Sequence, residues 1–510
     1  MTQTSAVAPP PPEAKPRTGS RRDALRDLRL LGGVAAVYTL VQLVAVLPGT
    51  GLGWDESVYV SQVSGQAPAA FFSAPRARGI TFLVAPVTGL TSSVVVLRVY
   101  LALLSGAGLL VALWVWRRLL PTGTLALAGA LFAGLWVSVL YGPQAMPNLW
   151  VAYGALIAVG CFLRAARDHG DRAALAGLGA GMLLAALMRP SDALWLALPL
   201  VAAASAVRSL RRPVLLLVIA AGGALGAAEW VAEAYVRYGG LLPRLRRASE
   251  IQGHLGWHPA FGDHVRALQG LTLCRPCDVP LRYPLAAVWW FALPVLAAYG
   301  VRVAVGTRQA AAVALPALAG LSLAAPYLLL IGYAAPRFLL PAYGLLALPT
   351  AVCLLRLAAF ARPSRVLSAG LVLAVAAHLT VQFLVLDGVT ARGRATHAAF
   401  GLLVADLRRQ GVRPPCVVSG EEAVRIAFRA GCASRQVGGH DGSITRAELA
   451  AAARGRPVAV IVRGDAPPPA YAQGWRRHAL PGLPGIADLR AYLGPAVGRR
   501  PSAGVSQPSP

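Results

Sequence analysis

Long apolar runs recur along most of this chain, and they constrain its fold more than any other feature. An α-helix needs about 20 apolar residues to cross a hydrocarbon core of about 30 Å. By that measure the sequence predicts about eleven membrane spans, near residues 30–48, 94–116, 122–141, 148–165, 173–188, 192–207, 214–236, 285–303, 309–332, 337–357 and 366–387. Charged residues make up only 14% of the 510 residues, which excludes an ordinary soluble enzyme and a disordered chain.

The basic residues predict how these spans are oriented. Lys and Arg number 48 against 21 acidic residues, a net charge of +27 that would suggest nucleic acid binding on a soluble protein. Here the first cluster, 21–29, precedes the first span, and the clusters at 117–118, 164–172, 208–212, 302–308 and 356–365 follow alternate spans, so all of them lie on one side of the membrane. Cytoplasmic loops carry this excess, so we expect a cytoplasmic N-terminus in the inner membrane and no nucleic acid partner.

That orientation predicts four regions. Residues 1–28 read as a disordered cytoplasmic tail, and residues 29–390 as an all-α polytopic domain with outer loops 49–93 and 237–284. Residues 391–495 alternate strand-length apolar runs, such as Val458–Val462, with helical patterns such as Glu421–Ala430. This alternation predicts a small extracytoplasmic α/β domain, followed by a second disordered tail at 496–510.

The six cysteines divide between spans and outer segments. Cys161 and Cys353 lie within spans and are expected to act as small apolar residues. Cys416 and Cys432 lie in the predicted outer domain, where an oxidising compartment permits a disulfide. Cys274 and Cys277 form a C-x-x-C motif that fits a disulfide or two thiols better than a metal site, because no second ligand pair accompanies it.

Acidic residues are scarce between residues 30 and 390, and one pair lies where topology does not require it. Asp55 and Glu56 closely follow the first span and are flanked by Trp54 and Tyr59. A solvated loop pair is the ordinary alternative. A functional pair is about as well supported, since charges at the membrane are costly and often functional.

Several motifs, in order, resemble the GT-C superfamily of membrane glycosyltransferases, which use polyprenyl-phosphate sugars. The branches in question are the protein O-mannosyltransferases and the aminoarabinose transferases. The resemblance covers residues 25–390 and rests on the acidic pair, a long first outer loop and an outer C-terminal domain. Three further stretches are similar: Tyr141–Asn148, Leu187–Ser191 with its Arg-Pro break, and Tyr333–Pro341 at the entry to a late span.

The resemblance implies a sugar transfer with inversion on the outer face of the membrane. The phosphate of the donor leaves without a strong general acid, so one carboxylate can act as general base for an acceptor hydroxyl of a glycan, lipid or protein. The resemblance gives this role to Asp55, with Glu56 beside it in the catalytic pair as a neighbour or substrate contact. Candidates for binding the departing phosphate are Arg337 above all, and Arg189, Arg78 and Arg76. Interfacial anchoring is the alternative for Arg337, and a local ion pair with Asp192 is the alternative for Arg189.

Acceptor contacts are expected from Trp54, Tyr59, Glu229, Glu233 and His258. Glu229, Glu233 and Arg237 share one helix face, so a self-satisfied ion ladder is slightly favoured there. His254, His258 and His264 lie in the large outer loop, but Gly256 and Pro259 argue against the helix that a metal site would need. No resident metal or other cofactor is predicted, and a divalent cation stays open.

Two other functional classes stay open. A transporter or flippase of lipid-linked sugars would favour internal repeats and mid-membrane acids, neither of which is evident. A non-catalytic relative that binds glycan is kept open by two departures from the family pattern. Gln144 stands where many relatives carry an acid, and Ala74–Ile80 replaces a His-Pro-Pro motif.

Overall fold

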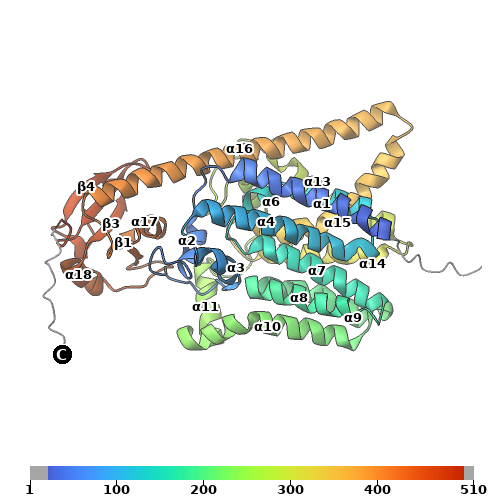
Figure 1. Cartoon of the computed structure of the whole chain (residues 1–510), viewed down its shortest axis with the longest axis horizontal. Helices are drawn as coiled ribbons and strands as arrows, with labels where there is room; N and C mark the ends of the chain where they lie inside the picture. The colour runs from blue at the N-terminus through green and yellow to red at the C-terminus, as the bar shows by residue number, and fades with distance from the viewer. Residues whose placement is uncertain (1–20, 499–510) are drawn as a thin grey trace, which may run out of the picture.

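The computed structural model describes residues 21–498 as a bundle of long helices with a small sheet domain at one end (Figure 1). Eight helices in this range are long and apolar enough to cross a bilayer. They are α1 (Arg21–Val41, extended by the π-helix Gln42–Val46), α4 (Val94–Trp114), α7 (Asn148–Arg167), α10 (Pro213–Tyr238), α13 (Val288–Ala304), α14 (Ala310–Leu329), α15 (Leu340–Ala361) and α16 (Arg365–Arg409). The chain is a multi-pass membrane protein, as its apolar runs predict.

Shorter helices complete the bundle and cover one of its ends. The apolar ones are α3 (Gly79–Thr88), α5 (Thr122–Ala133), α8 (Arg172–Met188) and α9 (Pro190–Ala206). The others are α2 (Trp54–Ser61), α6 (Trp136–Tyr141), α11 (Leu241–Ile251) and α12 (Phe261–Ala267). Helices α7 and α15 are the most buried of the long helices and form the centre of the bundle.

Two predicted boundaries differ from the structure, one at the start of α1 and one within the span predicted over 122–141. Residues 21–28, predicted as part of a tail, form the first turns of α1; residues 1–20 and 499–510 lie outside the described residues. The span predicted over 122–141 is wrong as a single helix, because it breaks between α5 and α6. Leu135 is extended there, and the free N–H of Trp136 donates to Gln382 Oε1 at 3.0 Å. A side chain of α16 thus replaces the missing backbone acceptor.

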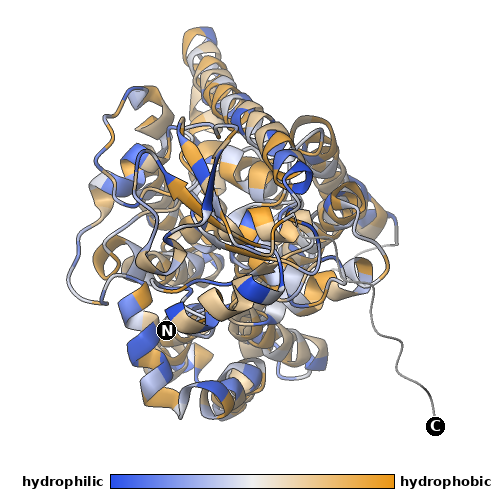
Figure 2. Ribbon diagram, turned by 90° about the vertical axis from the view of Figure 1, so that its left-hand side faces the viewer, coloured by the Kyte–Doolittle hydropathy of each residue, from blue (hydrophilic) through white to orange (hydrophobic). Residues whose placement is uncertain are grey.

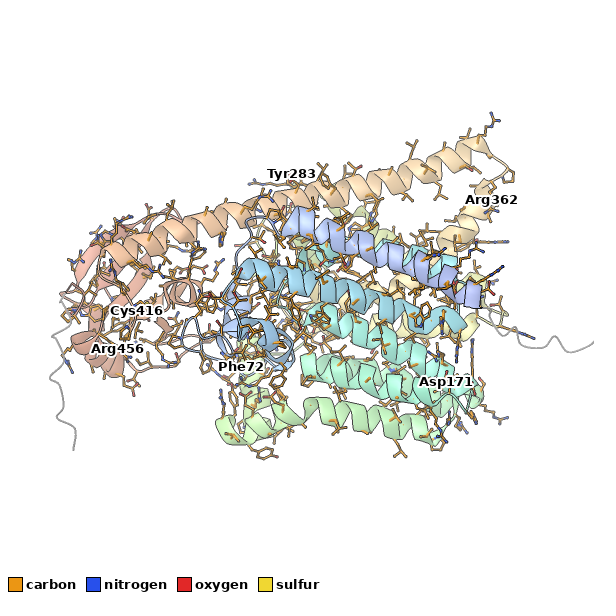
Figure 3. All side chains as sticks on the ribbon, in the orientation of Figure 1. Phe72, Asp171, Tyr283, Arg362, Cys416 and Arg456 are labelled. Carbon is orange, nitrogen blue, oxygen red and sulfur yellow. A yellow bond between two sulfur atoms is a disulfide. The ribbon has the colours of Figure 1, made fainter. Side chains whose placement is uncertain are left out.

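The basic loops meet at the end of the bundle away from the sheet domain. Arg118 and Arg164 both pair with Asp171, at 3.3 and 2.7 Å. Arg212 donates to the carbonyl of Ala165, and Arg167 to that of Arg308. Figure 3 shows Asp171 and Arg362 at this end and Phe72 at the other. The predicted alternation of basic loops about the spans is therefore present.

A five-stranded mixed sheet forms the C-terminal domain. Its strands are β1 (Val417–Gly420), β2 (Ala433–Ser434), β3 (Val458–Arg463), β4 (Arg476–Leu480) and β5 (Leu489–Leu493), in the order β2-β1-β3-β5-β4. Strands β2, β1 and β3 are parallel, and β5 is antiparallel to both β3 and β4. Helices α17 (Ala423–Ala430) and α18 (Arg446–Gly455) pack against it. Figure 2 looks along the bundle from this end, with the sheet in front.

Helix α16 joins the two parts without a break. It runs for 45 residues, past the span predicted to end at 387 and the domain boundary predicted at 390. The apolar stripe of Phe400, Leu403, Val404 and Leu407 continues its helical period and is buried against the sheet domain. A second buried surface therefore keeps the chain helical after it leaves the membrane.

Candidate active site

A cavity of about 570 Å³ lies between the helix bundle and the sheet domain. One wall comes from the start of α2 and from the turn between α6 and α7, and includes Asp55, Glu56 and Gln144. Another comes from α16 and α17. The principal polar lining residues are Trp54, Asp55, Glu56, Gln66, Tyr141, Gln144, Thr272, Arg337, Thr390, Arg392, His397, Glu422, Arg425 and Arg429.

The local sequence explains why α2 begins at the acidic pair. Gly53 is extended and precedes the helix, and its N–H donates to Glu56 Oε2 at 2.9 Å as in a capping box. Asp55 and Glu56 therefore occupy the first helical turn, where the helix dipole favours negative charge. Their side chains diverge from there, one toward the cavity and one into the protein.

Asp55 is held between two arginines at the cavity wall. Its Oδ1 pairs with Arg76 Nη2 at 2.5 Å, and its Oδ2 with Arg337 Nη2 at 3.0 Å. The carboxylate keeps 31% of its surface exposed. Burial raises the pKa of Asp55, but the charges of Arg76 and Arg337 outweigh burial and hold the pKa below its usual value.

Glu56 faces inward and is almost fully buried. Arg98 of α4 donates to both of its oxygens, at 2.5 and 2.8 Å, and the Ala145 N–H donates to Oε1 at 2.7 Å. Arg98 also binds the carbonyls of Gly51 and Pro143. This carboxylate thus ties the start of α2 to α4 and to the turn before α7.

Arg337 lies just before α15, on the short 3₁₀ turn Pro336–Leu339. Besides Asp55, its guanidinium donates to the Thr272 carbonyl at 2.9 Å and contacts Tyr141 Oη at 3.5 Å. Its Nε is buried and has no hydrogen-bond partner among the described residues. A buried donor left over in this way is available to an anionic ligand.

Arg189 lies near this group but has its own supports. It pairs with Asp192 at 3.4 Å, and its guanidinium lies 5.5 Å and 5.6 Å from the ring centres of Tyr327 and Phe338. Asp192 is buried and also accepts a 2.5 Å hydrogen bond from Tyr327. The positive charge of Arg189 also acts on Asp55 and lowers the pKa of that carboxyl. Three arginines therefore influence this one carboxylate.

Arg78 belongs to a second ion network behind the cavity. It pairs with Glu233 at 2.6 Å and with Glu229 at 3.2 Å, and it lies over the Phe72 ring. Glu233 also pairs with the fully buried Arg244 at 2.9 Å. Arg244 donates further to the backbone carbonyls of Ala74 and Arg76, so the network fixes the loop that carries Arg76.

The remaining predicted residues separate into two groups. Trp54 lines the cavity, and Tyr59 is buried behind it, with Arg76 5.8 Å from its ring centre. His258 does not line the cavity; its backbone binds Leu329, and Nε2 contacts the His254 carbonyl at 3.1 Å. Over residues 21–498 no three His, Cys, Asp or Glu side chains converge as metal ligands would. Cys274–Cys277 and Cys416–Cys432 are disulfides.

Sequence reasoning missed four arginines that shape the site. Arg98 lies five residues into a predicted span, and a charge there is a recognised sign of a buried partner. Arg244 carries no such signal, because it lies in a loop rich in arginine. Arg392 and Arg429 line the wall formed by α16 and α17 and have no carboxylate partner among the residues described. Arg392 was out of reach because its helix was expected to end at residue 387, and no sequence pattern placed Arg429 beside the bundle.

The arrangement of the helix bundle and the C-terminal sheet domain matches that of solved protein structures. ArnT from Cupriavidus metallidurans has this fold: its apo structure matches with a TM-score of 0.63 at 14% identity, over 94% of this chain and 100% of that chain. Its complex with undecaprenyl phosphate matches over the same shares at 14% identity and a TM-score of 0.61. The predicted GT-C resemblance is confirmed at the level of the fold.

A more distant likeness is to the oligosaccharyltransferase AglB from Archaeoglobus fulgidus, in complex with an inhibitory peptide and a dolichol-phosphate. It has 13% identity and a TM-score of 0.48, over 81% of this chain and 65% of that chain. No protein-family model matches the sequence, and no curated protein sequence matches it.

Proposed function

We propose that this protein is a glycosyltransferase that moves a sugar from a polyprenyl phosphate to an acceptor hydroxyl, with inversion at the anomeric carbon. The observation that carries the proposal is Asp55, held at a cavity wall between Arg76 and Arg337. A carboxylate in direct contact with two arginines places a base and a phosphate-binding site next to each other. The ArnT fold supports a polyprenyl phosphate as the carrier, since one ArnT structure is bound to undecaprenyl phosphate.

The transfer exchanges one carbon–oxygen bond for another. The acceptor oxygen attacks the anomeric carbon, Asp55 takes the acceptor proton, and the bond from that carbon to the phosphate oxygen breaks. The phosphate leaves with the electron pair, and the guanidinium groups of Arg337 and Arg76 neutralise its growing charge. The partnerless Nε of Arg337 gives this arginine a further donor for the phosphate.

Donor binding also activates the base. Without a donor, Arg76 and Arg337 are engaged by Asp55, and their charges make its carboxylate a weak proton acceptor. A donor phosphate competes for the same guanidinium groups and draws them away from the carboxylate. Asp55 then regains basicity when a lipid phosphate occupies the site.

Other residues serve as positioning residues in this proposal. Glu56 fixes the start of α2 through Arg98, and Arg78 with Glu229 and Glu233 supports the loop of Arg76. Arg189 adds positive charge near the phosphate site, and Trp54 offers an aromatic face to the acceptor. The Tyr59 ring supports the Arg76 guanidinium, which lies 5.8 Å from the centre of the ring. His258 lies outside the cavity lining and has a role in the loop that covers α14.

The wall formed by α16 and α17 favours an acceptor that brings negative charge. Arg392 and Arg429 face the cavity without a carboxylate among residues 21–498, whereas Arg425 is neutralised by Glu422 at 2.6 Å. Two uncompensated cations opposite the base would attract and orient an anionic glycan, lipid or protein segment.

We further propose that the cavity faces the outside of the cytoplasmic membrane. The clustering of basic loops at the opposite end supports this orientation. Arg456→Cys, in the sheet domain, should react with a membrane-impermeant maleimide in intact cells. Arg362→Cys, at the opposite end, should react only after lysis. The reverse pattern would overturn the orientation.

The activity test uses purified protein, a panel of polyprenyl-phosphate sugars and acceptors from the cell envelope. Wild type should release polyprenyl phosphate and glycosylate an acceptor, and Asp55→Asn should not. Asp263→Asn is the matched control, because Asp263 lies away from the cavity in a partly exposed pair with Arg266. No transfer by wild type from any donor would remove the proposed function. Normal transfer by Asp55→Asn would remove the base.

A further inference from the structure

The segment 272–277 lies directly against the segment that carries Arg337. Cys274 and Ala334 form an isolated antiparallel bridge, with N–H to carbonyl distances of 2.8 Å and 3.3 Å. Both residues are buried, together with Ala267. Arg337 follows Ala334 by three residues, so the position of Cys274 and the position of Arg337 are fixed by one short stretch of chain.

The same segment touches the guanidinium itself. The Thr272 carbonyl accepts a hydrogen bond from Arg337 Nη1 at 2.9 Å, and Thr272 lines the cavity. Nη1 therefore points at Thr272 while Nη2 points at Asp55. Because a guanidinium is planar and rigid, these two bonds fix the direction in which the remaining donor, Nε, faces.

The disulfide holds this segment together with a few hydrogen bonds, such as that from the Arg282 N–H to Gln269 Oε1 at 2.9 Å. Residues 272–283 contain no helix and no strand apart from the bridge at Cys274. The Cys274–Cys277 bond closes a tight loop within it, and Arg275 lies 4.6 Å from the ring centre of Tyr333. The Cys277 sulfur also lies 3.6 Å from the Asp263 carbonyl, and Cys277 packs against the buried cluster of Ala267, Cys274 and Ala334.

We propose that the Cys274–Cys277 disulfide is a positioning element for Arg337, so that binding of a phosphate-bearing lipid depends on the oxidation of this one cysteine pair. The inference rests on the proposed function, because it takes Arg337 as the phosphate ligand. A closed loop holds Thr272 where its carbonyl can orient the guanidinium. An opened loop lets Thr272 move, and Arg337 loses one of the two bonds that aim it.

The test compares two double variants. Cys274→Ser/Cys277→Ser opens the loop beside Arg337. Cys416→Ser/Cys432→Ser removes the other disulfide, which lies in the sheet domain and does not contact Arg337. Binding of undecaprenyl phosphate to the full-length protein in detergent is the readout, with thermal melting as the check on folding. The first variant should bind about tenfold more weakly, the equivalent of one hydrogen bond to a charged group, and the second should match wild type.

Two further measurements separate positioning from general damage. In an Arg337→Ala background the Cys274→Ser/Cys277→Ser change should weaken binding no further, because the residue it positions is gone. Dithiothreitol should weaken binding by wild type and by Cys416→Ser/Cys432→Ser, and leave Cys274→Ser/Cys277→Ser unchanged. Equal binding by the two disulfide variants, or an equal loss without Arg337, would overturn the inference. Wild type that binds no undecaprenyl phosphate would instead overturn the proposed function.

Discussion

Glu56 and Arg98 form a two-point ion pair, 2.5 Å and 2.8 Å long, in which both side chains are almost completely buried. The pair joins the first turn of α2, which carries the proposed base, to a membrane helix. A buried ion pair gives no large net stability by itself, but removal of one partner leaves an uncompensated charge. Glu56 therefore acts on the chemistry through the position of Asp55.

Glu56→Gln should lower the free energy of unfolding by about 3–5 kcal/mol, because the Arg98 charge would lose its partner in a buried site. Thermal melting in detergent measures the loss. Glu250→Gln, which breaks a half-exposed pair with Arg247, should change stability by less than about 1 kcal/mol. A Glu56→Gln protein that melts normally yet transfers no sugar would assign Glu56 to the chemistry itself.

Asp55→Asn should bind undecaprenyl phosphate at least as tightly as wild type while transferring no sugar. The reason is that the Asp55 carboxylate competes with the phosphate for Arg76 and Arg337. Arg337→Ala should bind at least about tenfold more weakly, because hydrogen bonds to a charged group are lost. Equilibrium binding of the lipid measures both changes. Weaker binding by Asp55→Asn would show that the carboxylate does not compete with the donor.

The pH dependence of transfer should differ between kcat/KM and kcat. In the donor-free protein the arginines hold the pKa of Asp55 below its usual value, so the acid limb of kcat/KM should lie at lower pH than for an ordinary aspartate. With donor bound the arginines turn to the phosphate, the pKa of Asp55 rises, and the acid limb of kcat should lie at higher pH. The lowered pKa also means that these ion pairs stabilise the fold at neutral pH and are lost as pH falls. A kcat limb at or below that of kcat/KM would refute the coupling.

His264 should make the protein sensitive to mild acid. Burial lowers the pKa of His264 to about 4, although its Nε2 contacts the Tyr327 carbonyl at 3.2 Å. The unfolded chain takes up the proton near pH 6.5, so stability should fall between pH 6.5 and 4 by about 3 kcal/mol. Melting curves across this range should show a smaller decline for His264→Gln. An equal decline in both proteins would assign the acid sensitivity to other groups.

Prediction from sequence succeeded where one residue pattern had one physical cause. Runs of about 20 apolar residues predicted the long helices. Basic loops after alternate spans predicted which helix ends gather at the same end of the bundle. The scarcity of acids drew attention to Asp55, which does lie at the cavity. Arg76 and Arg337 were named as candidates, but their shared contact with Asp55 joins segments 21 and 282 residues away from it. No local sequence pattern predicts a contact between residues that are so far apart in the chain.

The remaining differences arose from tertiary contacts that override local signals. The break between α5 and α6 depends on Gln382, which lies 246 residues after Trp136. The extension of α16 depends on apolar residues that only the sheet domain buries. Glu56 looked equivalent to Asp55 in the sequence, but one step along a helix turned it toward Arg98. Adjacent positions on a helix face different surroundings, and periodicity alone does not reveal them.

An unbroken helix of 45 residues is about 67 Å long at 1.5 Å per residue, roughly twice the thickness of the hydrocarbon core. Thr390, Arg392 and His397 lie on the stretch of α16 that forms the cavity wall. The N-terminal part of this one helix is therefore expected to lie in lipid, and its C-terminal part packs against the sheet domain. A change in bilayer thickness or lateral pressure that tilts the membrane part of α16 would be expected to move the sheet domain with it and change the width of the cavity mouth. The mechanical state of the membrane would then set how readily an acceptor enters.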